Sequence, residues 1–121
     1  MAVLKLVNNA GNRNERNLCF VNSSLQLLYS VPDINDFFKS RSYRENFTGK
    51  LPVSDEMSRI FRTEGETMAS AAELRRLIGQ YYRRPDIYNG SQQDMEEFTR
   101  LLLTCIEKEL ENSVLRQEYA N

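Results

Sequence analysis

Two short stretches of this 121-residue chain carry side chains that could do chemistry. Cys19 supplies a thiol where an Asn-rich turn changes to a helical apolar pattern. Amide N–H groups and the positive end of the dipole at a helix start favour the thiolate, which is the nucleophilic form. Asn14, just upstream, carries an amide that could donate a hydrogen bond to an oxyanion beside the sulfur. This position suits a nucleophile, but a lone Cys is more often a small apolar core residue, and the local pattern alone favours that second interpretation.

The second stretch is acidic and runs from Gly90 to Phe98. Asp94 and Glu97 are three residues apart, so on a helix the two carboxylates share a face. Such a pair near a helix start suits a basic peptide. The alternative is a well-capped helix whose first turn carries acids because the helix dipole favours them there. From the residues alone, both interpretations stand.

Helical patterning surrounds the thiol. The first helix is expected over about 19–30, and Pro32 is expected to end it, because the residue before a proline avoids the helical region. Asp33 is then expected to cap a short second helix, and Ser54 a third. The thiol therefore lies at the start of the first helix of a helical domain.

The later helices carry capping signals of their own. Ser70–Glu73 matches a capping box, with Ser at the cap and Glu three residues later. Residues 84–90 are expected to form a loop, since they contain Pro, Asn and Gly. Ser91 and Asp94 repeat the capping signal at the start of the longest helix, about 91–112. These signals predict a mainly α fold of about five helices.

Composition indicates one compact domain over 1–121, with a lead-in at 1–13. The chain has 16 Lys and Arg against 17 Asp and Glu, so its net charge of −1 gives no case for a nucleic-acid partner. The pairs Arg75–Arg76 and Arg83–Arg84 are expected on solvated helix faces. No apolar run approaches the about 20 residues that span a membrane, and no secretory core is present. We therefore expect an intracellular protein, in the cytoplasm or nucleus, with no membrane partner.

Cysteine and histidine counts limit the available chemistry. Cys19 and Cys105 are far apart, which is neither a disulfide framework nor a zinc spacing, so no metal or cofactor is expected. Cys105 falls on the apolar stripe of the last helix and is expected in the core. The chain contains no His. It therefore has no imidazole to activate a thiol or a water.

The stretch from Asn14 to Gln26 resembles the cysteine box of the ubiquitin-specific proteases, Asn-x-Gly-Asn-Thr-Cys-Tyr-x-Asn-Ser-x-Leu-Gln. The residues on matching positions are Asn14, Asn17, Cys19, Asn22, Ser23, Leu25 and Gln26. The resemblance implies that Cys19 is the nucleophile position and Asn14 the oxyanion position. Phe20 stands at the Tyr position, Arg16 at the Gly position and Leu18 at the Thr position. Gly tolerates backbone angles that Arg does not, so the loop before the thiol is expected to differ from the family's.

The stretch Gly90–Phe98 and the leucines behind it resemble the family's Gln-Gln-Asp box, Gln-Gln-Asp-x-x-Glu-Phe. In the family, the positions that match Asp94 and Glu97 contact the Arg-rich C-terminal tail of ubiquitin. The resemblance implies the same role for these two residues, with Gln93 as a third substrate-binding position. It extends over about residues 6–112. The implied fold is the helical thumb lobe of the papain-like ubiquitin-specific protease fold.

The resemblance also implies lobes that have no counterpart here. In the family, the catalytic His and the residue that orients it come from a later lobe, the palm, and a finger lobe grips ubiquitin. We therefore expect this chain, which has no His, to be inactive alone. It would be either a fragment of a thiol-dependent deubiquitinase or a truncated relative that binds the ubiquitin tail or acts as a scaffold. The alternative is a non-catalytic helical interaction module that does not bind ubiquitin.

A thumb lobe without its palm would expose an apolar surface. Large exposed apolar patches on folded domains usually mark an interaction site. The expected partners are therefore the ubiquitin C-terminal tail and, for the palm-facing surface, a second copy of the chain or another protein.

Overall fold

The computed structural model describes residues 4–7, 17–45, 49–64, 67–88 and 93–120, with only the backbone of residues 112–120. These ranges contain six α-helices and a short 3-10 helix: α1 (Cys19–Tyr29), α2 (Pro32–Lys39), η2 (Ser42–Arg44), α3 (Pro52–Phe61), α4 (Ala72–Tyr81), α5 (Pro85–Tyr88) and α6 (Met95–Ala120). Within them the only strand-like pairing is an isolated bridge between Leu6 and Ala69. The predicted mainly α fold is confirmed, with six α-helices where about five were expected.

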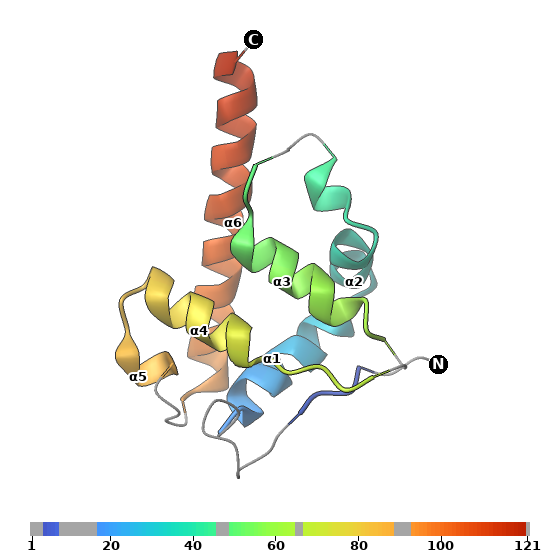
Figure 1. Ribbon diagram of the computed structural model, residues 1–121, viewed down its shortest axis with the longest axis vertical. Coiled ribbons are helices and arrows are strands. Elements are labelled where there is room, and N and C mark those ends of the chain that lie inside the picture. Colours follow the sequence, from blue (N-terminus) through green and yellow to red (C-terminus); the bar gives the residue numbers. More distant parts are fainter. Residues whose placement is uncertain (1–3, 8–16, 46–48, 65–66, 89–92, 121) are drawn as a thin grey trace.

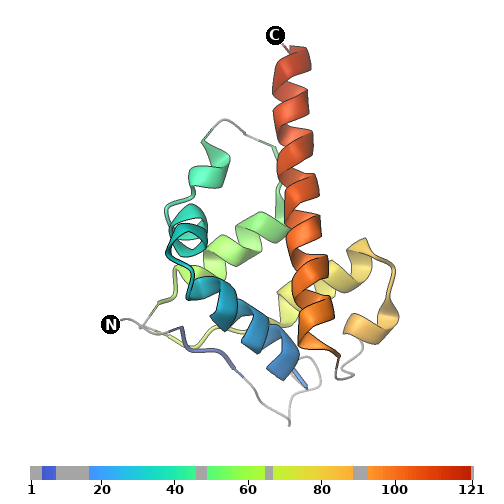
Figure 2. The same cartoon turned by 180° about the vertical axis from the view of Figure 1, so that it is seen from behind.

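Helix α6 is the longest element, and the others are arranged around its first half (Figure 1). At 26 residues it is about 39 Å long. Helices α1, α3 and α4 all contact it, and its C-terminal end projects beyond them in both views (Figures 1 and 2). The core therefore lies beside the N-terminal half of α6.

One apolar cluster joins all six α-helices. Its most buried members include Leu25 of α1, Phe38 of α2, Phe61 of α3, Ile78 of α4, Ile87 of α5 and Leu102 of α6. Cys105 of α6 is also fully buried, and burial raises the pKa of its thiol to about 12. The prediction that Cys105 belongs to the core is confirmed.

Two helices begin at prolines rather than at the predicted caps. Pro32 is the first residue of α2, so Asp33 lies inside the first turn and does not cap the helix. Pro52 is likewise the first residue of α3, and Ser54 lies inside that helix. Both cap predictions are wrong, because proline has no N–H to satisfy and its fixed φ suits the first helical position.

Two N–H groups in the first turn of α3, which have no partner within the helix, are satisfied from α6. The Glu109 carboxylate accepts hydrogen bonds from the backbone N–H of Val53 at 2.8 Å and of Ser54 at 3.0 Å. It also accepts one from Ser54 Oγ at 2.8 Å. A carboxylate at a helix N-terminus favours the helix through hydrogen bonds and the dipole. Glu109 therefore both caps α3 and fastens it to α6.

The capping box predicted at Ser70–Glu73 is only half formed. Helix α4 starts at Ala72, and Ser70 Oγ accepts the Ala72 N–H at 3.2 Å. Ala71 is the N-cap residue and provides no side-chain cap. Glu73 does not reach back but forms an ion pair with Arg76 on the outer face of the helix. The prediction of a reciprocal capping box is therefore wrong, because the guanidinium of Arg76 binds the Glu73 carboxylate.

The start of α6 differs from the predicted one. Asp94 precedes the first helical residue, and its Oδ1 accepts the Glu97 N–H at 2.9 Å. Asp94 is therefore the cap, and Ser91 lies outside the described residues. The helix extends to Ala120, beyond the expected end near residue 112.

The segment predicted as a loop at 84–90 contains α5, which packs closely on α4. A Cβ added to Gly79 would lie 2.5 Å from Cδ1 of Tyr88, so only Gly allows this approach. The Arg84 N–H donates to the Gly79 carbonyl at 2.8 Å and closes the turn. Of the arginines expected on solvated faces, Arg75 is only 2% exposed and contradicts that prediction.

We expect Glu109→Ala to lower the free energy of unfolding by about 1–3 kcal/mol, because it removes the cap of α3 and leaves buried donors unsatisfied. Urea unfolding followed by circular dichroism measures this. Glu111→Ala, on an exposed position of the same helix, is the matched control and should change stability by less than about 0.5 kcal/mol. Equal effects of the two substitutions would contradict the capping role.

Candidate functional site

Cys19 is the first residue of α1, as predicted, and its side chain is exposed. The residue before it, Leu18, is fully buried, and its carbonyl accepts the Asn22 N–H at 2.8 Å. Asn17 has a positive φ of 55°, so the chain turns sharply just before the helix. Asn14, the predicted oxyanion donor, lies outside the described residues. The thiol is thus presented to solvent at a helix start by a buried leucine.

Two other residues of the cysteine box hold the N-terminal segment against α1. Asn22 Nδ2 donates to the Val7 carbonyl at 3.0 Å, and Gln26 Nε2 donates to the Leu4 carbonyl at 2.7 Å. The segment continues into the bridge with Ala69, because the Val7 N–H donates to the Ala69 carbonyl at 2.9 Å. These amides of the box therefore hold the backbone of residues 4–7 against α1, the helix that begins with Cys19.

The two motif stretches meet where α1 packs on α6. The buried rings of Phe20 and Phe98 are in edge-to-face contact, with centroids 5.2 Å apart. One turn further along, the hydroxyls of Ser24 and Thr99 hydrogen bond at 2.6 Å. Both helices begin at the same end of the molecule (Figure 2). Since Cys19 adjoins Phe20, the thiol and the acidic stretch lie at one end of the α1–α6 pair.

Each residue predicted to bind the substrate tail has an intramolecular partner. Gln93 Nε2 donates to the Asp86 carbonyl at 2.9 Å, and Asp94 caps α6. The partly exposed carboxylate of Glu97 forms an ion pair with Arg84. The capping alternative therefore holds for Asp94. Capping and binding are compatible, because a carboxylate oxygen accepts more than one hydrogen bond.

Arg84 is the residue that sequence reasoning missed. Its guanidinium lies between two carboxylates, with Nη1 toward Glu97 and Nη2 2.6 Å from Oδ2 of Asp86. These hydrogen bonds, first from Asp86 and then from Glu97, raise the pKa of Arg84 above its usual value. No local sequence signal links Arg84 to Glu97. The two residues come together only because the connection between α4 and α5 carries Arg84 to the start of α6. The acidic site thus already holds a guanidinium of the chain itself.

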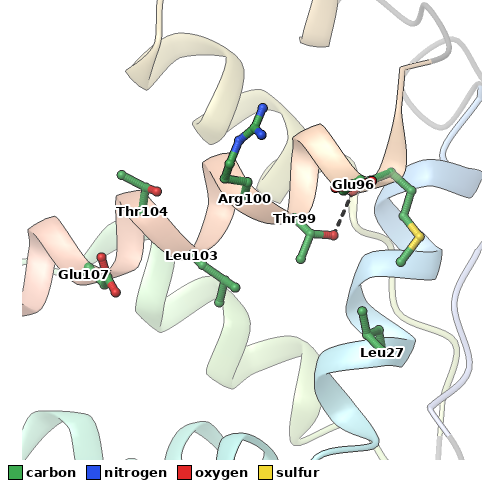
Figure 3. Close-up of a pocket in the computed structure, with 8 residues that line it drawn as sticks. Leu27, Glu96, Thr99, Arg100, Leu103, Thr104 and Glu107 are labelled. Carbon is green, nitrogen blue, oxygen red and sulfur yellow. Dashed lines mark hydrogen bonds between the residues drawn. The ribbon is translucent and has the colours of Figure 1, made fainter.

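A second surface, the α1–α6 groove, lies beside this end of the molecule and includes Leu27, Met95, Glu96, Arg100, Leu103 and Glu107 (Figure 3). The cavity in this groove has a volume of about 550 Å³. Two leucines that line it are exposed, Leu27 to 49% and Leu103 to 39%. A neighbouring cavity of about 320 Å³ against α2 shares Leu103 and Glu107. Such exposed leucines are consistent with the apolar surface that the sequence predicts.

Among the described residues, no cluster of three or more His, Cys, Asp or Glu side chains could hold a metal ion. Over the same part of the chain, no helix is both long and apolar enough to cross a membrane.

The model of the family described as ubiquitin carboxyl-terminal hydrolase matches residues 10–120. The chain belongs to this family. Human ubiquitin carboxyl-terminal hydrolase 2 is 30% identical over 115 residues, which cover 88% of this chain and 19% of that protein. Ubiquitin carboxyl-terminal hydrolase 12 of Saccharomyces cerevisiae is 26% identical over 122 residues, which cover 88% of this chain and 9% of that protein. Ubiquitin carboxyl-terminal hydrolase 21 of Rattus norvegicus is 27% identical over 107 residues, which cover 83% of this chain and 19% of that protein.

Family membership confirms the resemblance that the two boxes carry. The matches span no more than 19% of the length of these relatives. The activity of the whole relatives therefore does not transfer directly to this chain. The individual roles of Cys19, Asn14, Gln93, Asp94 and Glu97 stay predictions.

We expect only one of the two cysteines to react with a thiol reagent such as DTNB in the folded chain. Cys19 is exposed, whereas Cys105 is buried and its raised pKa leaves about one thiol in 10,000 ionised at pH 8. Cys19→Ser should abolish the fast reaction, and Cys105→Ser should leave it unchanged. In denaturant, both thiols of the unsubstituted chain should react. Two equally fast thiols under native conditions would contradict the structure.

Proposed function

We propose that this chain is the thumb part of a thiol-dependent deubiquitinase, or a relative of it that has kept the site for the ubiquitin tail. The observation that carries the proposal is the contact between Phe20 and Phe98, which brings the cysteine box and the Gln-Gln-Asp box to one end of the α1–α6 pair. Membership of the family supports ubiquitin conjugates as the proposed substrate class. An intracellular location, expected from the sequence, belongs to the same proposal.

In the proposed reaction, the Cys19 thiolate attacks the carbonyl carbon of the last residue of ubiquitin. A bond forms between Sγ and that carbon, and the side-chain amide of Asn14 stabilises the negative charge that develops on the carbonyl oxygen. The nitrogen of the leaving amine first accepts a proton. The tetrahedral intermediate then collapses, the C–N bond breaks and the amine departs. Water then hydrolyses the thioester.

The proton transfers need a group that this chain does not contain. A cysteine hydrolase ordinarily uses a His to take the thiol proton and to protonate the leaving amine, and the sequence has none. We infer that the base comes from a further lobe or from another chain. The 121 residues alone are then a binding and nucleophile-bearing unit without turnover.

The acidic end of the α1–α6 pair suits the Arg-rich tail. The Glu97 carboxylate already accepts a guanidinium from Arg84, so its position and exposure are suitable for an arginine. Asp94 adds a second carboxylate at the same helix start. Partly exposed ion pairs contribute only about 0–1 kcal/mol each, so binding by this part alone should be weak.

The second candidate function is a non-catalytic helical module, and the α1–α6 groove favours it. Exposed Leu27 and Leu103 around a cavity of about 550 Å³ suit a protein partner or a second copy of the chain. A module of this kind would bind through the groove and would not need Asp94 or Glu97. The two functions therefore depend on different residues.

An NMR titration of the labelled chain with unlabelled ubiquitin tests the first candidate. We expect shifts at residues 17–20 and 93–98, and at least about fivefold weaker binding by the double substitution Asp94→Asn with Glu97→Gln. Asn caps a helix about as well as Asp, so this change removes charge while keeping the cap.

Glu96→Gln is the matched control for this titration, because Glu96 is an exposed acid of the same turn that lines the groove. It should leave the ubiquitin affinity unchanged. A folded chain with no shifts, or with equal binding by the double variant, would refute tail binding and favour the interaction module.

We further expect Arg84→Ala to tighten the binding of an Arg-containing tail peptide. Arg84 occupies the Glu97 carboxylate, and an exposed ion pair of about 0.2–1 kcal/mol corresponds to about a 1.5- to 5-fold change in affinity. Fluorescence anisotropy with a labelled peptide of the ubiquitin C-terminus measures it. Arg83→Ala, the neighbouring exposed position, is the control. Weaker binding by Arg84→Ala would mean that Arg84 holds the Glu97 side chain in place and does not compete with the peptide for its carboxylate.

A further inference from the structure

A cavity of about 330 Å³ lies between η2 and the end of α3, and it shares no lining residue with the α1–α6 groove. Three arginines line it, Arg41, Arg59 and Arg62. The remaining lining residues are Tyr43, Asp55, Ser58 and Thr63. Charged and hydroxyl-bearing residues therefore line the cavity, and the positive side chains outnumber its single acid.

The acids near this cavity are bound by other groups. Asp55 is held by Arg44, with Nε 2.8 Å from Oδ1 and Nη2 2.5 Å from Oδ2, and it accepts the Tyr43 hydroxyl at 2.7 Å. The hydrogen bonds from Arg44 hold the pKa of Asp55 below its usual range. Glu56 of α3 pairs with Arg59 at 2.5 Å. Each carboxylate is therefore already held by a guanidinium, Asp55 by that of Arg44 and Glu56 by that of Arg59.

Arg41 and Arg62 are less completely neutralised than the other arginines of this region. The charge of Arg41 acts on Asp55, but the paired hydrogen bonds to that carboxylate come from Arg44. Both residues are exposed, and neither forms a salt bridge with any residue that the structure describes. They come from different elements, since Arg41 follows α2 and Arg62 follows α3. Two guanidinium groups from separate segments therefore line one cavity, and the third, that of Arg59, is already paired with Glu56.

We propose that this cavity binds an anion of the phosphate class through Arg41 and Arg62. A guanidinium is planar and forms paired hydrogen bonds with phosphate oxygens. A phosphate monoester carries about −1.5 to −2 charges at pH 7, which matches the excess positive charge. The cavity volume is at the lower end of the about 300–1,000 Å³ typical of ligand sites, so a phosphate and a small part of its carrier fit.

A structural role for Arg62 competes with this proposal. Arg62 is the C-cap residue of α3, where a cation complements the negative end of the helix dipole. That role would affect the stability of the chain and would leave phosphate binding unchanged. Measuring both quantities on the same variants separates the two roles.

Arg41 and Arg83 provide a matched pair of variants. Both have a left-handed backbone, with φ of 65° and 54°, and each directly follows the C-cap residue of a helix, α2 for Arg41 and α4 for Arg83. Gly is the residue that this backbone favours, so Arg41→Gly and Arg83→Gly remove the same charge without a folding penalty. Only Arg41 lines the cavity.

The experiment is an NMR titration of the complete labelled chain with inorganic phosphate at constant ionic strength and pH 7, and with phenyl phosphate in a second arm. We expect saturable shifts at residues 41–44 and 58–63. Arg41→Gly and Arg62→Gln should each weaken binding by at least about tenfold, and Arg83→Gly by less than twofold. Tighter binding of phenyl phosphate would support a phosphorylated side chain as the source, and tighter binding of inorganic phosphate would support the free ion.

Absence of saturation in the unsubstituted chain would overturn the proposal. Equal weakening by Arg41→Gly and Arg83→Gly would also overturn it, since that is a general effect of charge. A loss of unfolding free energy in Arg62→Gln with unchanged phosphate affinity would assign Arg62 to the helix end and refute its binding role. None of these outcomes depends on whether the chain binds ubiquitin.

Discussion

The packing of α1 on the first half of α6 is the contact on which the candidate site depends. Phe20 and Phe98 are both buried, and each such side chain contributes about 1.5–3 kcal/mol when it leaves water. Ser24 is fully buried, and its hydroxyl lies 2.6 Å from that of Thr99, so sliding one helix along the other would separate the two hydroxyls. The apolar pair provides most of the energy, and the hydroxyl pair sets the register that brings the two boxes together.

Helix α6 carries this arrangement into the rest of the domain. About three turns beyond Phe98, Glu109 binds the N-terminus of α3. The same helix therefore presents the acidic stretch at one end and organises the core further along. A change that loosens α3 would be transmitted to the position of α6, and through it to the site.

The regular features of the chain could be predicted because they depend on local patterns. The apolar period located α1 and its start at Cys19, and it assigned Cys105 to the core. The starts of α2 and α3 were misplaced because a proline and a capping residue lie within two positions of each other, and the proline takes the first helical position. Arg75 was misplaced because a charged residue next to an apolar stripe has the same local pattern whether it is buried or exposed.

The candidate site was harder to predict than the helices. The residue types of the two boxes identified the family, yet the partners of those residues depend on tertiary structure. Glu109 reaches α3 across more than fifty residues of sequence, and Arg84 reaches Glu97 through the α4–α5 turn. Spacing along the chain contains no information about either contact.

The close approach of Gly79 to Tyr88 has a consequence for that turn. Because α5 is packed directly on the backbone of α4, the connection that carries Arg84 is short and held by backbone hydrogen bonds. Arg84 is therefore present at Glu97 at a high effective concentration, because the conformational freedom of the backbone that carries it was already lost when the chain folded. An incoming guanidinium must lose translational and side-chain freedom before it can form the same pair. An arginine from outside therefore gains a place at Glu97 only if the rest of its peptide contributes binding energy elsewhere on the surface.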